Sequence, residues 1–113
     1  MAIAYAKFFP PTLLTTSDAV IYTVPTVPAT TLLRNARVRL TNFTATATTG
    51  RVHAVPNAGA VSTTNAFFYE VTIPANDYVD VDVPILSAGD TIQARAGTAS
   101  AVNMQAISGG LFS

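Results

Sequence analysis

Hydrophobic and polar residues alternate with a period of two through much of this chain, which is typical of strands that bury one face. In residues 34–43, apolar side chains alternate with arginines, and in residues 78–83 valines alternate with polar residues. Residues 91–96 repeat the pattern after a tight polar turn. The expected inward positions are Ala36, Val38, Leu40, Val79, Val81, Val83, Ile92, Ala94 and Ala96.

Proline, glycine and asparagine divide the chain into short segments of even length, and no segment has helical periodicity. We expect strands at residues 19–24, 34–43, 51–55, 66–73, 78–83, 91–96 and 101–107. Seven or eight short strands with regular turns predict an all-β fold, an antiparallel β-sandwich, as a single domain over residues 1–113. Residues 1–11 end in two prolines and are expected to form an extended N-terminal arm.

One loop, two turns and one face are predicted in more detail. Residues 57–65 are a loop by composition, and residues 74–77 form a turn because proline presets φ and Asn and Asp bond to nearby backbone. The turn at Ala88-Gly89-Asp90 fixes the register of the strand after it, since a one-residue slip would turn the buried face outward. In residues 19–24, the expected shared face is that of Val20, Tyr22 and Val24.

Charged residues are scarce: they make up 11% of the 113 residues, and the formal net charge is zero. Typical globular domains carry about 25%. Such a surface lacks the repulsion that keeps monomers apart, which favours assembly into a larger structure. The alternative is a monomer with a neutral surface rich in Thr and Ser.

Composition also argues against several classes of partner. There is no basic excess to hold nucleic acid, and no run approaches the roughly 20 apolar residues of a membrane span. The chain contains no cysteine, so it has no thiolate, disulfide or cysteine-based metal site. We expect neither nucleic acid nor membrane as a partner, and no cofactor.

The chain offers little catalytic chemistry. His53 is the sole histidine, and no Gly-x-Ser-x-Gly motif provides a nucleophile for it, which favours a structural role. Asp77, Asp80 and Asp82 form an acidic cluster, but two carboxylates on one strand face lie roughly 6.5–7 Å apart at their Cα atoms. The ligands are too few for calcium, and the spacing is not that of an EF-hand loop. We therefore expect no catalytic residue and no metal site.

A second interpretation of the acidic cluster is electrostatic. Arg37 and Arg39 share the two-residue spacing of Asp80 and Asp82. Two such strands can pair acid against base, worth roughly 0.2–1 kcal/mol per pair. The two faces can equally meet across subunits. All four residues are candidate interface residues.

Apolar and aromatic residues near the chain ends are further interface candidates: Tyr5, Phe8 and Phe9 in the arm, and Leu111 and Phe112 in the tail. An arm or tail of this kind adds strands to neighbouring subunits or fills their grooves.

A central aromatic run stands at residues 67–69. Alternation places Phe67 and Tyr69 on one face and Phe68 on the other. An aromatic side chain left exposed there, or at Tyr78, could stack on a sugar or a partner.

Four segments resemble a family of small all-β virion proteins of tailed bacteriophages. They are TLLTTSDAVIYTVP (Thr12–Pro25), RVRLTNFT (Arg37–Thr44), VTIPANDYVDVDVPILSAGDTIQARAG (Val71–Gly97) and AVNMQAISG (Ala101–Gly109). The resemblance covers residues 12–109, and residues 45–65 depart from it by being rich in Ala and Thr.

The resemblance implies a jelly-roll-like sandwich in a virion, assembled in the host cytoplasm, and it brings no catalytic or ligand residues. The implied function is a head decoration (cement) protein, bound as a dimer or trimer to the major capsid protein or other virion proteins. The alternative is a small tail, neck or fibre component, including a carbohydrate- or receptor-binding module. A non-enzymatic role is expected.

Overall fold

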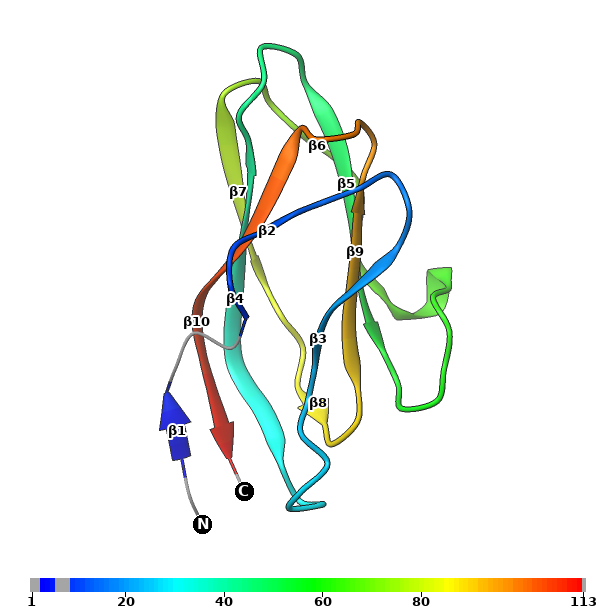
Figure 1. The fold of residues 1–113 in the computed structure, drawn as a ribbon, viewed down its shortest axis with the longest axis vertical. Coiled ribbons are helices and arrows are strands. Elements are labelled where there is room, and N and C mark those ends of the chain that lie inside the picture. Colours follow the sequence, from blue (N-terminus) through cyan, green and yellow to red (C-terminus); the bar gives the residue numbers. More distant parts are fainter. Residues whose placement is uncertain (1–2, 6–8, 113) are drawn as a thin grey trace.

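The computed structural model describes residues 3–5 and 9–112, which form ten strands and one short 3₁₀ helix (Figure 1). The strands are β1 (Ile3–Tyr5), β2 (Thr12–Leu13), β3 (Ala19–Thr23), β4 (Leu32–Asn42), β5 (Thr48–Val55), β6 (Ala66–Ile73), β7 (Asp77–Asp82), β8 (Leu86–Ser87), β9 (Thr91–Ala96) and β10 (Val102–Phe112). The 3₁₀ helix, η1, spans Thr63–Asn65. The all-β prediction is confirmed, and each of the seven expected strands is present.

The strands build two antiparallel sheets. Sheet A has the order β1-β10-β4-β7, with β2 also paired to β10 and β8 to β4. Sheet B has the order β3-β9-β5-β6. The expected number of strands was too low, because β1, β2 and β8 are only two or three residues long and carry no alternation of their own.

The pairing is nested along the chain. β5 pairs with β6, β4 with β7, β3 with β9 and β2 with β10, so each pair encloses the one before it. Successive pairs lie alternately in sheet B and sheet A. Two further ladders, β4 with β10 and β5 with β9, join the pairs within each sheet.

Side chains from both sheets form the core. Val38 and Leu40 of β4 and Met104 of β10 meet Val52 of β5 and Ile92 of β9, all of them fully buried. Burial of each such side chain stabilises the fold by roughly 1.5–3 kcal/mol. The expected inward faces of β4 and β9 are confirmed, while Val79 and Val81 on the edge strand β7 are half-buried.

One expected face is wrong because β3 contains a bulge. Val20 pairs with Gln93, and Tyr22 pairs with Ile92, so Ile21 is an extra residue in the ladder. The bulge reverses the alternation. Val20 therefore faces solvent and is 57% exposed, whereas Tyr22 packs against the core.

The last strand is longer than the alternation indicates. It was expected to end at residue 107, but β10 continues through two glycines to Phe112. The continuation pairs on one side with the start of β4 and on the other with β1. These partners supply the backbone hydrogen bonds that hold an otherwise weak strand segment.

Candidate functional site

The outer face of sheet A carries the predicted arginines and aspartates, and the structure brings them together within one chain. Arg39 pairs with Asp80 and Arg37 with Asp82 across β4 and β7. The Nε atom of Arg37 lies 2.8 Å from an Asp82 carboxylate oxygen. Arg39 donates hydrogen bonds of 2.7 and 3.0 Å from Nε and Nη2 to the two carboxylate oxygens of Asp80. The prediction that acid pairs with base on neighbouring strands is confirmed.

The two ion pairs differ in their surroundings. The Arg39–Asp80 pair is partly shielded, whereas the side chain of Asp82 is 83% exposed. The hydrogen bond from Arg39 lowers the pKa of Asp80 below its usual value, and the same bond raises the pKa of Arg39. The Arg39 guanidinium also stacks on Tyr78, 4.1 Å from the ring centroid, so the pair has fixed geometry.

A hollow of about 470 Å³ adjoins the Arg37–Asp82 ion pair. At this point along β4, pairing with β7 ends and pairing with β8 begins. The hollow is lined by Asn35, Ala36, Arg37, Asp82, Val83, Pro84 and Ile85. Asn35 has a φ of 56°, in the left-handed region, at the position where the ladder changes partner. Ile85 is 63% exposed, so the hollow has an apolar rim next to a charged one.

The arm and the tail, expected to reach neighbouring subunits, lie against each other in this chain. Ile3, Ala4 and Tyr5 of β1 pair with Phe112, Leu111 and Gly110 at the end of β10 (Figure 1). Leu111 and Phe112 are half-buried, and Arg34 stacks on the Phe112 ring at 5.2 Å.

Two further arm residues were expected at an interface. Phe9 is only 3% exposed and belongs to the core of its own chain, so its ring does not face solvent. Phe8 lies outside the described residues.

The polar turn before β9 joins three parts of the chain. Gly89 has a φ of 85°, which the absence of a side chain permits. The Asp90 carboxylate accepts hydrogen bonds of 2.9 Å from the backbone N–H groups of Ser87 and Asn57. The backbone of the turn also exchanges hydrogen bonds with Val24. The turn therefore joins the start of β9 to Val24 and to the loop at Asn57.

His53 is buried beneath a loop. Its outward position on β5 is covered by the loop that contains η1, and the residue is 2% exposed. Its Nδ1 atom lies 3.0 Å from the Ser62 carbonyl oxygen and from the Asn65 side-chain oxygen. Two acceptors at one nitrogen assign the Nδ1–H tautomer, which leaves the buried Nε2 atom without a partner among the described residues.

The aromatic run on β6 is divided between core and surface. Phe68 is buried and cannot stack on a ligand, whereas Tyr69 is 45% exposed. Phe67 is a bulge residue, because Phe68 pairs with Val52 and Ala66 with His53. It is half-buried and packs against the core, so it does not share the outward face of Tyr69.

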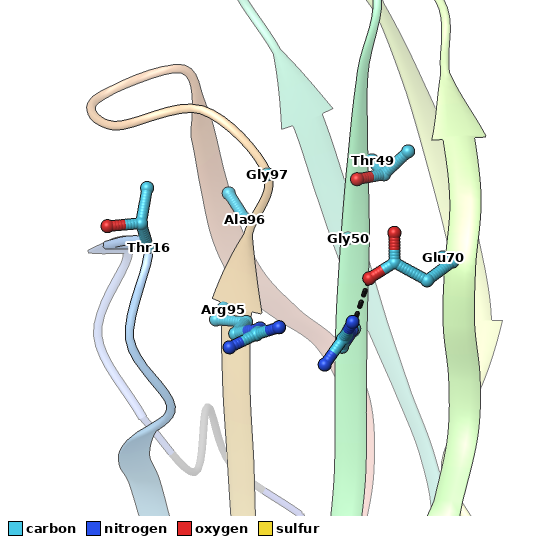
Figure 2. A pocket seen from close by; sticks show the side chains of 8 residues that line it. Thr16, Thr49, Gly50, Glu70, Arg95, Ala96 and Gly97 are labelled. Carbon is cyan, nitrogen blue, oxygen red and sulfur yellow. Dashed lines mark hydrogen bonds and ion pairs between the residues drawn. The ribbon is translucent and has the colours of Figure 1, made fainter. Parts of the chain in front are cut away.

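A second hollow, of about 150 Å³, lies on the outer face of sheet B and was missed in the sequence (Figure 2). It is lined by Thr16, Thr49, Gly50, Arg51, Glu70, Arg95, Ala96 and Gly97. Arg51 and Arg95 are direct cross-strand partners on β5 and β9. Arg51 forms an ion pair with Glu70 and stacks on Tyr69, 4.6 Å from the ring centroid. The alternation places both arginines outward, but only the strand register brings them together.

These two surfaces present charged side chains beside hollows. Among the described residues, no three His, Asp or Glu side chains gather as a metal site. No helix in that part of the chain is long and apolar enough to cross a membrane. The charged groups instead form ion pairs between strands, with one arginine pair beside an open hollow.

Comparison of the chain with known protein families, curated proteins and solved structures finds no match.

Proposed function

We propose that this chain is a jelly-roll protein of a tailed-phage virion, a head decoration protein that binds neighbouring capsid subunits. The observation that carries the proposal is the nested order of strand pairs. Pairing of the first strand with the last, and so on inward to a central hairpin, supports a jelly roll, which is built from two Greek keys. Jelly rolls are common in viral capsid proteins and lectins.

The sparse charge supports a structural role. A neutral surface lowers the cost of desolvation when subunits are packed closely. Arg37, Arg39 and Arg51 are each already paired with an acidic side chain of the same chain. Three of the six basic residues are therefore balanced within the protein, which suits contact with another protein better than contact with nucleic acid.

The edge of sheet A at β7 is the partner-binding surface in this proposal. The ladders of β3 and β6, the edge strands of sheet B, contain register shifts, whereas β7 pairs with β4 through six consecutive residues without one. A regular edge can accept another strand. Asp77, Asp80 and Asp82 along it disfavour pairing with a second β7, and so favour a different partner.

The apolar part of the same surface is Ile85, beside the larger hollow. A partner segment paired to β7 would reach this hollow at the end of the strand. Many copies bound in this way stabilise a shell by multivalency even when each contact is weak. A dimer or trimer of the decoration protein would increase that effect.

The test begins with particles purified from cells that carry the gene in its native genome. We expect mass spectrometry to find the chain in stoichiometric amount, gold-labelled antibody to locate it on heads, and light scattering to give a dimer or trimer. Ile85→Lys should abolish incorporation, whereas Val27→Lys, at a loop residue that is 83% exposed, should not. Absence of the chain from particles would refute the proposal.

The second candidate function is binding of carbohydrate within a tail or fibre, which the lectin use of jelly rolls and the exposed rings of Tyr69 and Tyr78 favour. A glycan array with the purified protein tests it. Saturable binding that is lost in Tyr69→Ala or Tyr78→Ala would support this function in place of decoration, and a blank array would exclude it for the glycans tested.

A further inference from the structure

We propose that the hollow on the outer face of sheet B binds a carboxylate group, held by Arg95 with Arg51 beside it. The inference does not depend on a virion role, because it rests on the charges and space of this surface. The carboxylate can belong to a free small molecule, such as a sugar acid, or to an acidic side chain of another protein.

The first argument is the arrangement of charge. Like charges directly opposite each other on neighbouring strands destabilise a sheet. Arg51 offsets its charge with Glu70, whereas none of the ion pairs or hydrogen bonds formed by the described side chains involves Arg95. Asp18 immediately precedes β3, the neighbour of β9, but it forms no ion pair with any described residue and does not line the hollow. Two guanidinium groups and one carboxylate leave one positive charge at the surface.

The second argument is the space in front of these charges. Figure 2 shows the Arg95 side chain on β9, and the dashed line from Glu70 marks its ion pair with Arg51. Gly97 packs closely against Thr49 at the end of the hollow, because a Cβ atom there would lie 2.5 Å from the Thr49 hydroxyl oxygen. Thr16 and Thr49 also line the hollow, and a threonine hydroxyl group can donate a hydrogen bond.

The third argument distinguishes carboxylate from phosphate. A single excess positive charge matches one carboxylate, and a planar guanidinium binds a carboxylate through two parallel hydrogen bonds. A phosphate carries up to two negative charges at neutral pH, and Glu70 at the same hollow would repel it more strongly. The volume of about 150 Å³ holds a carboxylate and a few attached atoms.

The test is an NMR titration that follows the Nε–Hε signals of the arginines at constant ionic strength. The probes are acetate, glucuronate, the blocked peptide acetyl-Gly-Glu-Gly-amide and inorganic phosphate. We expect saturable shifts of Arg95 and Arg51 with the three carboxylates and weaker binding of phosphate. Glucuronate binding more tightly than the peptide points to a sugar acid as the ligand, and the reverse order points to a protein side chain.

Variants separate the site from general charge effects. Arg95→Gln should weaken carboxylate binding about tenfold or more, the loss expected for a hydrogen-bonded charge. Gly97→Ala should weaken it because the new Cβ atom would displace the Thr49 hydroxyl group at the end of the hollow. Arg34→Gln, which removes an exposed arginine from sheet A, and Asp18→Asn should leave it unchanged. Each variant is first checked for an unaltered amide spectrum.

Three results would overturn the inference. They are linear shifts without saturation, phosphate binding at least as tight as carboxylate, and equal losses in Arg95→Gln and Arg34→Gln. Carboxylate binding that occurs only in Asp18→Asn would also overturn it, because Asp18 would then be the resident partner of Arg95. None of these results bears on incorporation into particles, so a failure here leaves the proposed function standing.

Discussion

Arg39 and Asp80 form a bidentate ion pair across β4 and β7, with hydrogen bonds of 2.7 and 3.0 Å that occupy both carboxylate oxygens. The neighbouring pair, Arg37 with Asp82, is joined through one contact of 2.8 Å and is more exposed. Sheet A therefore contains two Arg–Asp ion pairs, one bidentate and partly shielded and one with a single contact and more exposed. Each pair is a control for the other.

Asp80→Asn should lower the free energy of unfolding by up to about 1 kcal/mol, since a bidentate, partly shielded pair lies at the upper end of the range for surface ion pairs. Asp82→Asn should change it by only a few tenths, about 0.3 kcal/mol or less, because solvent screens that pair. Urea denaturation of both variants measures the difference. Equal effects would show that the bidentate geometry adds nothing.

Stability should depend on pH through Asp80. Its pKa in the folded chain lies below the ordinary value of about 3.9, because Arg39 stabilises the ionised form. The contribution is therefore full above the unfolded-state pKa and disappears as the pH falls through the folded-state value. We expect the stability gap between the parent and Asp80→Asn, measured in urea, to be constant near neutral pH and to close in acid. A gap that stays constant with falling pH for as long as both proteins remain folded would contradict this.

Gly89→Ala should destabilise the fold by about 1–3 kcal/mol. A left-handed φ of 85° is unfavourable for alanine, and the new Cβ atom would lie 2.7 Å from the Asn57 side chain. In an Asn57→Ala background the clash is absent and only the strain of the left-handed backbone remains. The loss of stability caused by Gly89→Ala should therefore be smaller. A double-mutant cycle by urea denaturation separates the two terms, and an unchanged cost would exclude the clash.

Ala58→Gly should stabilise the protein. Ala58 has a φ of 61° in an exposed loop, and release of left-handed strain, about 1–2 kcal/mol, exceeds the entropy that glycine adds to the unfolded chain. The net gain expected is about 0.5 kcal/mol, seen as a higher Tm. Ala60→Gly, two residues later in the same loop and outside the left-handed region, is the matched control and should be neutral or destabilising. A gain in the control as large as in Ala58→Gly would mean that strain is not the cause.

Much of the architecture is predictable because it depends on local periodicity. Alternation located seven strands and the buried faces of β4 and β9. The matched spacing of Arg37 and Arg39 with Asp80 and Asp82 indicated their pairing, since same-face residues on adjacent antiparallel strands keep equal spacing. The turn before β9 was recognisable from its glycine and aspartate.

Other features depend on contacts between distant segments. Nothing around Ile21 marks a bulge, and nothing in the arm distinguishes Phe9, which is buried, from an exposed aromatic. His53 lies on the outward side of β5, and it is buried only because a loop ten residues away folds over it.

The sequence by itself determined the strand-forming segments, the turns between them and which side chains can face inward, because these follow from backbone geometry over a few residues. Only the tertiary structure decided which strands are neighbours and in what register. That register places Arg51 opposite Arg95 from positions 44 residues apart, and it sets β1 against β10. Such pairings minimise the energy of the whole chain, so no local pattern of residues specifies them.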